Sequence, residues 1–223
     1  MLIEEIEPKY EKRYIVAFLD LLGASAKIKS SESEKLLSAM IYMLENVKNR
    51  WNNVEHAPIS LQDIKCVTFS DNIAIALELS EDLKKDEFWK KISDFILYIS
   101  VVQGAGLKNR LWFRGGITIG KLYVDTELNY IWGKALVDAH DLEAKYAKYP
   151  RVIIDSNMKI ENLPVNSRIV KDLDNRYFVD YISAIKKTQQ DWIDKNIAMI
   201  HAAENIEDKR VLEKYHWFLQ YVE

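Results

Sequence analysis

Two apolar runs in this sequence each end at an aspartate that lies beside a tight turn. Asp20 closes the run that begins at Tyr14 and precedes Gly23, and Asp71 follows the run that begins at Cys66. A carboxylate that ends a buried strand costs free energy unless a partner neutralises its charge, and a divalent cation commonly partners two of them. Two carboxylates, Mg²⁺ or Mn²⁺ and a phosphate are the components of nucleotidyl chemistry. The pattern therefore predicts a metal site that Asp20 and Asp71 share.

Each of the two aspartates also has a purely structural explanation. Asp20 suits the cap of a following helix, and Asp71 suits a tight turn. For either residue alone the structural explanation is preferable. The two together, in matching positions of neighbouring strands, favour the metal site.

The elements that must position these carboxylates follow from the apolar spacing. It predicts a strand over 13–20, a helix from residue 33 to about 51, strands over 64–69 and 73–79, a helix from about 88 that ends near the glycines 104 and 106, and a strand over 111–123. This order matches the ferredoxin-like βαββαβ pattern, in which both helices cover one face of an antiparallel sheet. In that topology the first strand and the following hairpin are neighbours, so the two aspartates can meet.

The remainder of the chain predicts a helix over 134–148, a strand over 151–155, a strand pair within 169–181 and two amphipathic helices. We expect an α/β fold of the α+β sandwich type. Residues 1–182 would form the catalytic domain. Residues 183–223 would form a helical extension packed on the same domain.

Four segments in this order resemble motifs of class III nucleotidyl cyclases: Phe18-Leu-Asp20-Leu-Leu-Gly23, Phe69-Ser-Asp71-Asn72, Phe113-Arg114-Gly-Gly-Ile-Thr-Ile-Gly120 and Tyr130-Ile-Trp132-Gly133. Each motif is weak alone, whereas four in the family's order are more specific. The resemblance runs from about residue 13 to 155.

The resemblance implies two Mg²⁺ or Mn²⁺ ions per active site, held by Asp20, Asp71 and the carbonyl of Leu21. It implies that three backbone amides at a helix start face the phosphates, those of Leu22, Gly23 and Ala24. Arg114 matches the family's phosphate-contacting arginine. The two glycines that follow it allow another backbone or a ligand to come close.

The sequence departs from purine cyclases at the positions that read the base. Val67 stands where they have a lysine, and Tyr130, shortly before the pocket residue Trp132, stands where they have an acidic residue. Adenine recognition by the usual pair of side chains is therefore excluded. Val67, Tyr130 and Trp132 remain the expected substrate-binding positions.

A second departure concerns the transition state. Val137 and Asp141 replace the asparagine and arginine that the family places on the helix after the Trp-Gly pair. Loss of a charge-stabilising group costs orders of magnitude in rate unless another residue replaces it. Four residues could do so, and the sequence does not choose among them: Lys134, Lys145, Lys148 and Arg151.

Three segments are more similar to the pyrimidine cyclases of bacterial Pycsar anti-phage systems: residues 114–123, 132–136 and 149–155. This resemblance implies a nucleoside triphosphate substrate, UTP in preference to CTP, and a cyclic nucleotide product read by a separate effector protein. It also implies a homodimer with active sites at the interface. Two alternatives stay open: a catalytically degenerate cyclase fold that binds nucleotide or a partner, and a palm-type polymerase with the same metal pair.

Composition limits the partners. The formal net charge is −3, with no long run of one sign, so a nucleic-acid partner is not expected. Cys66 is the single cysteine and allows no intramolecular disulfide, which fits a reducing cytoplasm. The chain begins without a signal-peptide core, and no apolar stretch reaches the about 18 residues needed to span a bilayer, so no membrane is expected.

Overall fold

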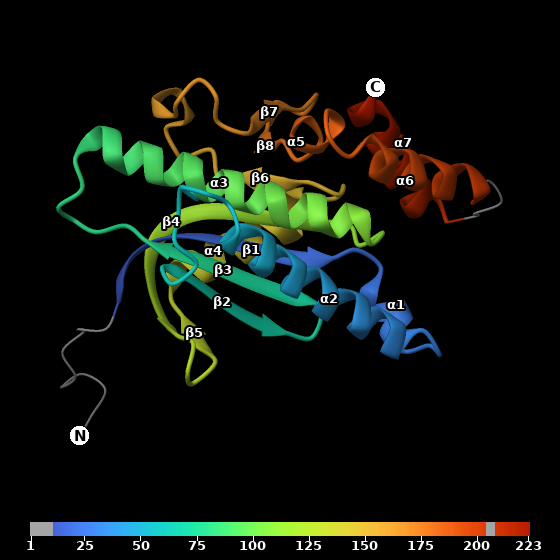
Figure 1. Ribbon diagram of the computed structural model, residues 1–223, viewed down its shortest axis with the longest axis horizontal. Helices are drawn as coiled ribbons and strands as arrows, with labels where there is room; N and C mark the ends of the chain where they lie inside the picture. The colour runs from blue at the N-terminus through green and yellow to red at the C-terminus, as the bar shows by residue number, and fades with distance from the viewer. Residues whose placement is uncertain (1–10, 204–207) are drawn as a thin grey trace.

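The computed structural model describes residues 11–203 and 208–223, which form an eight-stranded sheet with helices on both faces (Figure 1). The sheet order is β2-β3-β1-β4-β6-β8-β7, with β5 paired to β4. The strands are β1 Lys12–Leu21, β2 Ile64–Phe69, β3 Asn72–Glu78, β4 Phe113–Asp125, β5 Tyr130–Trp132, β6 Val152–Ile154, β7 Ile169–Lys171 and β8 Tyr177–Val179. The first four pair antiparallel as predicted, whereas β4 and β6 are parallel, so the sheet is mixed.

The helices are α1 Ala24–Ile28, α2 Ser33–Asn52, α3 Lys85–Lys108, α4 Lys134–Tyr146, α5 Ile182–Lys186, α6 Gln190–Ala202 and α7 Lys209–Val222, with a 3₁₀ turn over Ile160–Asn162. Helices α2 and α3 cover one face of the sheet, as expected, and α4 covers the other (Figure 1). In the described part of the chain, every helix is too short or too polar to cross a bilayer.

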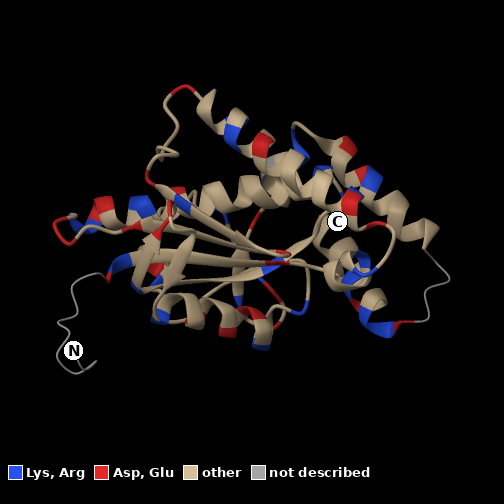
Figure 2. Cartoon of the chain, turned by 90° about the horizontal axis from the view of Figure 1, so that it is seen from below, with Lys and Arg blue, Asp and Glu red and all other residues tan. Residues whose placement is uncertain are grey.

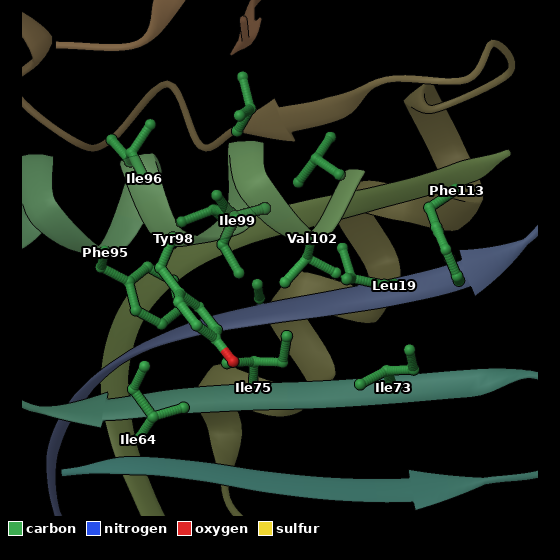
Figure 3. Packing of buried hydrophobic residues seen from close by; sticks show 14 of the residues in the cluster. Leu19, Ile64, Ile73, Ile75, Phe95, Ile96, Tyr98, Ile99, Val102 and Phe113 are labelled. Carbon is green, nitrogen blue, oxygen red and sulfur yellow. The ribbon is translucent and has the colours of Figure 1, made fainter. Parts of the chain in front are cut away.

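Alternation along β1 decides which face each side chain occupies. Leu19 points into the larger core, where α3 residues such as Phe95 and Ile99 pack on the sheet (Figure 3). Phe18 points to the opposite face with α4. Because successive strand residues point to opposite faces, Asp20 lies on the α4 face with Phe18.

Helix α3 ends near its two glycines as predicted, but the expectation that the glycines terminate it is wrong. The helix continues to Lys108, with Gly104 and Gly106 inside it. A Cβ added to Gly106 would lie 2.7 Å from the Leu111 carbonyl oxygen and 2.9 Å from the Phe113 ring. The glycines allow the close approach of the next strand and do not cap the helix.

A second core joins the C-terminal helices to the sheet. Trp112, just before β4, stacks on Phe218 of α7 and donates its indole N–H to Asn196 of α6 at 2.8 Å. Asn196 is fully buried and donates in turn to the Leu107 carbonyl at 2.8 Å. These contacts pack α6 and α7 on the sheet. The boundary at residue 183, between the catalytic domain and the helical extension, stays a prediction.

Candidate active site

Asp20 and Asp71 lie at the same end of two neighbouring strands. Asp20 is paired across the ladder with Asn72, and the Leu21 amide donates to the Asp71 carbonyl at 3.2 Å. Asp71 is the second residue of the two-residue β2–β3 turn, and Ser70 before it has φ of 57°. A positive φ at the first turn position is typical of a tight hairpin. The turn therefore places Asp71 directly beside the last residues of β1.

Asp71 also leans toward the face on which Asp20 lies. Side chains of directly paired strand residues share a face, so Asn72 lies on the same face as Asp20. The amide of Asn72 donates to Asp71 Oδ1 at 3.4 Å. The structure thus brings the two predicted metal ligands to one end and one face of the sheet.

The backbone after Asp20 agrees only in part with the phosphate cradle that the resemblance implies. Because the Leu21 amide points to Asp71, the Leu21 carbonyl points to the same side, toward the turn. The Leu22 amide donates to the Trp112 carbonyl at 2.8 Å and is not free to face a phosphate. The amides of Gly23, at φ of 78°, and Ala24, which starts α1, make no such contact with the described part of the chain.

Arg114 is the centre of a charged cluster with two carboxylates. It is paired with Asp20 across β1 and β4, and its Nε donates to Asp20 Oδ2 at 2.8 Å. The same Nε lies 2.8 Å from Oε1 of Glu143 on α4. This N–H donates to Asp20, whereas Glu143 Oε1 accepts no hydrogen bond from the described chain. Arg114 is thus shared between a strand and a helix carboxylate.

Glu143 was not predicted from the sequence. Its side chain is 5% exposed, and burial raises its pKa, as does the Asp20 charge, whereas Arg114 lowers it. The sequence feature that could have identified it is helical spacing: Glu143 follows Ala135 and Ala139 on the side of α4 that faces the sheet.

The glycines after Arg114 explain how Glu143 reaches it. A Cβ added to Gly116 would lie 2.4 Å from the Ala139 carbonyl oxygen of α4. Of the two explanations left open by the sequence, the approach of another backbone is therefore the correct one. Helix α4 packs so closely here that its next turn places Glu143 against Arg114.

The Gly116→Ala substitution is expected to destabilise the protein by about 1–3 kcal/mol, because α4 must move away from the sheet. Gly120→Ala is the matched control, since its Cβ would have Ala135 as its neighbour at a looser spacing, 3.2 Å from the methyl and 3.6 Å from Cα. Urea unfolding of both variants measures the difference. Equal stability of G116A and G120A would contradict the close approach of α4.

The Glu143→Gln substitution is expected to stabilise the protein most at high pH. Since the pKa of Glu143 is raised in the folded protein, the folded state holds an unfavourable buried charge once the pH exceeds that value. Below the ordinary glutamate pKa of about 4.3, the carboxyl is protonated in both states and the cost disappears. The stability of the wild type therefore falls as the pH rises from the ordinary glutamate pKa to the raised pKa of folded Glu143.

Thermal unfolding between about pH 4 and about pH 8 measures this effect. The gain in melting temperature of E143Q over wild type should grow with pH. The exposed Glu127 provides the control variant E127Q, which should show no such trend. A gain in melting temperature for E143Q that does not change with pH would contradict a buried charge at Glu143.

The predicted base-binding residues do not join this cluster within one chain. Val67 is buried on β2 and, paired with Ala74, lies on the Asp20 face. Tyr130 and Trp132 are 48% and 63% exposed on β5. Trp132 pairs with Tyr123, nine residues along β4 from Arg114, or about 30 Å along the strand at about 3.3 Å per residue.

The candidates for the missing transition-state cation are mostly engaged elsewhere. Lys134 and Lys145 form ion pairs on the outside of α4, with Asp138 at 2.5 Å and Asp141 at 2.6 Å. Arg151 is buried and binds Asp172 and Asp174. Lys148 is exposed.

The donor set at the end of β1 suits a hard divalent cation. Asp20 keeps Oδ1 free of the Arg114 hydrogen bond, and among the described residues only Asn72 donates to the Asp71 carboxylate, at 3.4 Å. Carboxylate and carbonyl oxygens are the ligands that Mg²⁺ and Mn²⁺ prefer. Within residues 11–203 and 208–223, no three His, Cys, Asp or Glu side chains gather closely enough to hold a metal by themselves. A metal here would depend on two carboxylates, a carbonyl and ligands from outside the chain.

The fold matches solved structures of nucleotide cyclases. The adenylyl cyclase CyaB from P. aeruginosa superimposes with a TM-score of 0.51 at 17% identity, over 76% of this chain and 94% of that one. The monomeric guanylyl cyclase domain of the RhoGC fusion protein from the aquatic fungus Blastocladiella emersonii gives 0.48 at 16%, over 76% and 95%. The guanylate cyclase domain of RhGC from Catenaria anguillulae, in complex with GTP, gives 0.48 at 14%, over 77% and 98%.

The sequence matches no family model and no curated protein. The likeness to CyaB, at 17% identity, concerns the fold alone. The chain therefore has the fold of class III nucleotidyl cyclases.

Proposed function

We propose that the protein is a metal-dependent nucleotidyl cyclase that converts a pyrimidine nucleoside triphosphate, UTP in preference to CTP, into its 3′,5′-cyclic monophosphate and pyrophosphate. One observation carries the proposal. Asp20 and Asp71 lie at one end and on one face of neighbouring strands, next to Arg114, in a fold shared with an adenylyl cyclase.

The reaction joins the ribose 3′-oxygen to the α-phosphorus and breaks the bond from that phosphorus to the pyrophosphate oxygen, while the 3′-hydroxyl proton passes to solvent. A bound Mg²⁺ or Mn²⁺ lowers the pKa of such a hydroxyl and neutralises phosphate charge. Asp20, Asp71 and the Leu21 carbonyl would hold the cation. Arg114 would face the phosphates, because binding of a cation at Asp20 frees its guanidinium to donate elsewhere.

The proposal includes a homodimer with shared sites. Tyr130 and Trp132 are exposed and far along β4 from Asp20, so one chain cannot use both groups on one nucleotide. Leu128 and Val137, within five residues of one or the other in the sequence, are also exposed, at 72% and 59%. Exposed apolar side chains that gather in one region are typical of an interface. A second copy would bring its Tyr130 and Trp132 to the base.

The choice of a pyrimidine rests on Val67 and Tyr130, which replace the charged base-reading residues of purine cyclases. An uncharged site favours a different set of base contacts but does not itself separate uracil from cytosine. By the resemblance to Pycsar cyclases, the cyclic product would act as a messenger in anti-phage defence and would be read by a separate effector protein.

The test is to incubate the purified protein with Mn²⁺ and each of the four ribonucleoside triphosphates, and to identify the products by mass spectrometry with pyrophosphate release. The expected result is a cyclic pyrimidine monophosphate. Linear oligomers would indicate a polymerase instead. No turnover of any triphosphate with Mn²⁺ or Mg²⁺ would overturn the enzyme proposal.

The second candidate is a degenerate cyclase fold that binds nucleotide without turnover. Val137 and Asp141 favour it, because Val137 is exposed and Asp141 is paired with Lys145. Calorimetry distinguishes the two candidates. Binding of a triphosphate without pyrophosphate release would support the binding module.

A further inference from the structure

The C-terminal helix α7 lies beside the candidate active site. Trp112 lies just before β4, two residues before Arg114, and the hydrogen bond from the Leu22 amide to the Trp112 carbonyl continues the β1–β4 ladder. The side chains of Trp112 and Arg114 therefore point to the same face. Tyr215 and Phe218 of α7 contact the Trp112 ring at centroid distances of 5.5 and 4.8 Å. Leu22, two residues after Asp20, packs against the same aromatic cluster. In Figure 1 the β1 arrow points toward the side of the molecule on which α7 lies, and in Figure 2 the C-terminus, at the end of α7, lies near one end of the sheet.

Lys214 lies on the packed side of this helix. Phe218 and Tyr221 follow it by four and seven residues, a spacing that puts all three on one side of α7. Phe218 is fully buried, and Lys214 is half-buried. Lys214 makes no ion pair or hydrogen bond with any described residue of the chain. An apolar side chain would be the ordinary occupant of such a position.

The charges around Lys214 belong to the candidate site. Its pKa is lowered by burial first and by Arg114 second, whereas Asp208 and Asp20 raise it. Both of these acids already bind an arginine, since Asp20 binds Arg114 at 2.8 Å and Asp208 binds Arg210 at 3.0 Å. Among the described residues, Lys214 has no carboxylate partner of its own, and a cation bound at Asp20 would free the guanidinium of Arg114. Both positive charges would then be available to an anion on this side of the sheet.

We propose that Lys214 and Arg114 together bind the phosphate tail of the nucleoside triphosphate, so that the C-terminal extension supplies part of the active site. This inference rests on the proposed function, because it takes the triphosphate substrate as the anion. An ammonium supplies a compact charge with three rotatable donors, and a guanidinium supplies a planar fork. The two would contact different oxygens of a polyphosphate chain.

The test measures binding of two probes by calorimetry with Mg²⁺ present: 3′-deoxy-UTP, which lacks the attacking hydroxyl and cannot cyclise, and inorganic tripolyphosphate. Lys214→Met keeps the aliphatic stem and removes the charge. It is expected to weaken binding of both probes by about 10- to 100-fold, as the loss of a charge-assisted contact does. Binding of 3′-deoxy-UMP should change much less. Lys214→Arg should restore most of the affinity.

Lys209→Met is the matched control, because Lys209 is exposed at the first turn of the same helix. It should change the binding of either probe less than about twofold. The melting temperature of K214M should equal or exceed that of wild type, because a half-buried charge is removed. A fall in melting temperature together with unchanged binding would show that Lys214 only balances the charge of Asp20, and would overturn the proposal.

The outcomes separate this inference from the proposed function. If the wild type turns over a triphosphate and K214M binds both probes normally, the inference fails and the cyclase proposal stands. If no triphosphate is turned over but K214M loses tripolyphosphate binding, the anion site stands and the cyclase proposal fails. Absence of tripolyphosphate binding to the wild type would also overturn the inference.

Discussion

Replacing Asp71 by asparagine is expected to lower the rate of nucleotide cyclisation by at least about a thousandfold, because a carboxylate that holds a catalytic cation cannot be replaced by a neutral amide. The fold should not suffer. Asp71 is half-buried in a turn and accepts one long side-chain hydrogen bond, from Asn72 at 3.4 Å. Its structural contact to β1 runs through its backbone carbonyl, which asparagine retains.

Initial rates of pyrophosphate release at saturating Mn²⁺ and triphosphate measure this effect. Asp63, exposed just before β2 at the other end of that strand, provides the matched control D63N, which should retain full activity. The two variants should have melting temperatures close to that of wild type. A D71N enzyme within about tenfold of the wild-type rate would remove Asp71 from the metal site.

The largest expected effect on stability comes from Arg151→Ala. Arg151 is 2% exposed and binds Asp172 and Asp174. Asp172 also accepts the indole N–H of Trp217 from α7 at 2.8 Å, so this cluster joins β6, the β7–β8 turn and the last helix. Removal of one partner of a buried ion pair leaves uncompensated charge and costs about 3–5 kcal/mol.

Urea unfolding at neutral pH measures the loss. The matched control is Arg176→Ala. Arg176 pairs with the same Asp174, but at the longer distance of 3.8 Å, and its side chain is one-third exposed. Its removal should cost at most about 1 kcal/mol. Equal stability of R151A and R176A would show that the buried cluster does not hold the C-terminal helices on the sheet.

Local patterns in the sequence determined most of the elements near the site. The apolar run over 13–20 became β1, the run over 64–69 became β2, and Ser70-Asp71 formed the expected tight turn between β2 and β3. Such features depend on side-chain alternation and turn chemistry within a few residues, and both are visible in the sequence. The adjacency of Asp20 and Asp71 followed from them through the strand order.

Contacts and distances between residues far apart in the chain could not be predicted from such local patterns. The glycines 104 and 106 are typical of a helix end by local rules, yet α3 continues through both because a neighbouring strand approaches closely. The Leu22 amide is a free donor in the motif but is used by Trp112, 90 residues later in the chain (112 − 22). The separation of Tyr130 and Trp132 from Asp20 likewise depends on where β5 pairs along β4.

The sequence by itself determined the order of strands and helices, the two carboxylates and the turn that positions Asp71, because each depends on neighbouring residues. Only the tertiary structure decided that Glu143 shares Arg114 with Asp20 and that α7 packs on Trp112, two residues before Arg114. These groups come together because small residues let α4 approach the sheet and because aromatic side chains pack α7 on Trp112. Contacts between residues distant in the chain follow from packing, which no local pattern specifies.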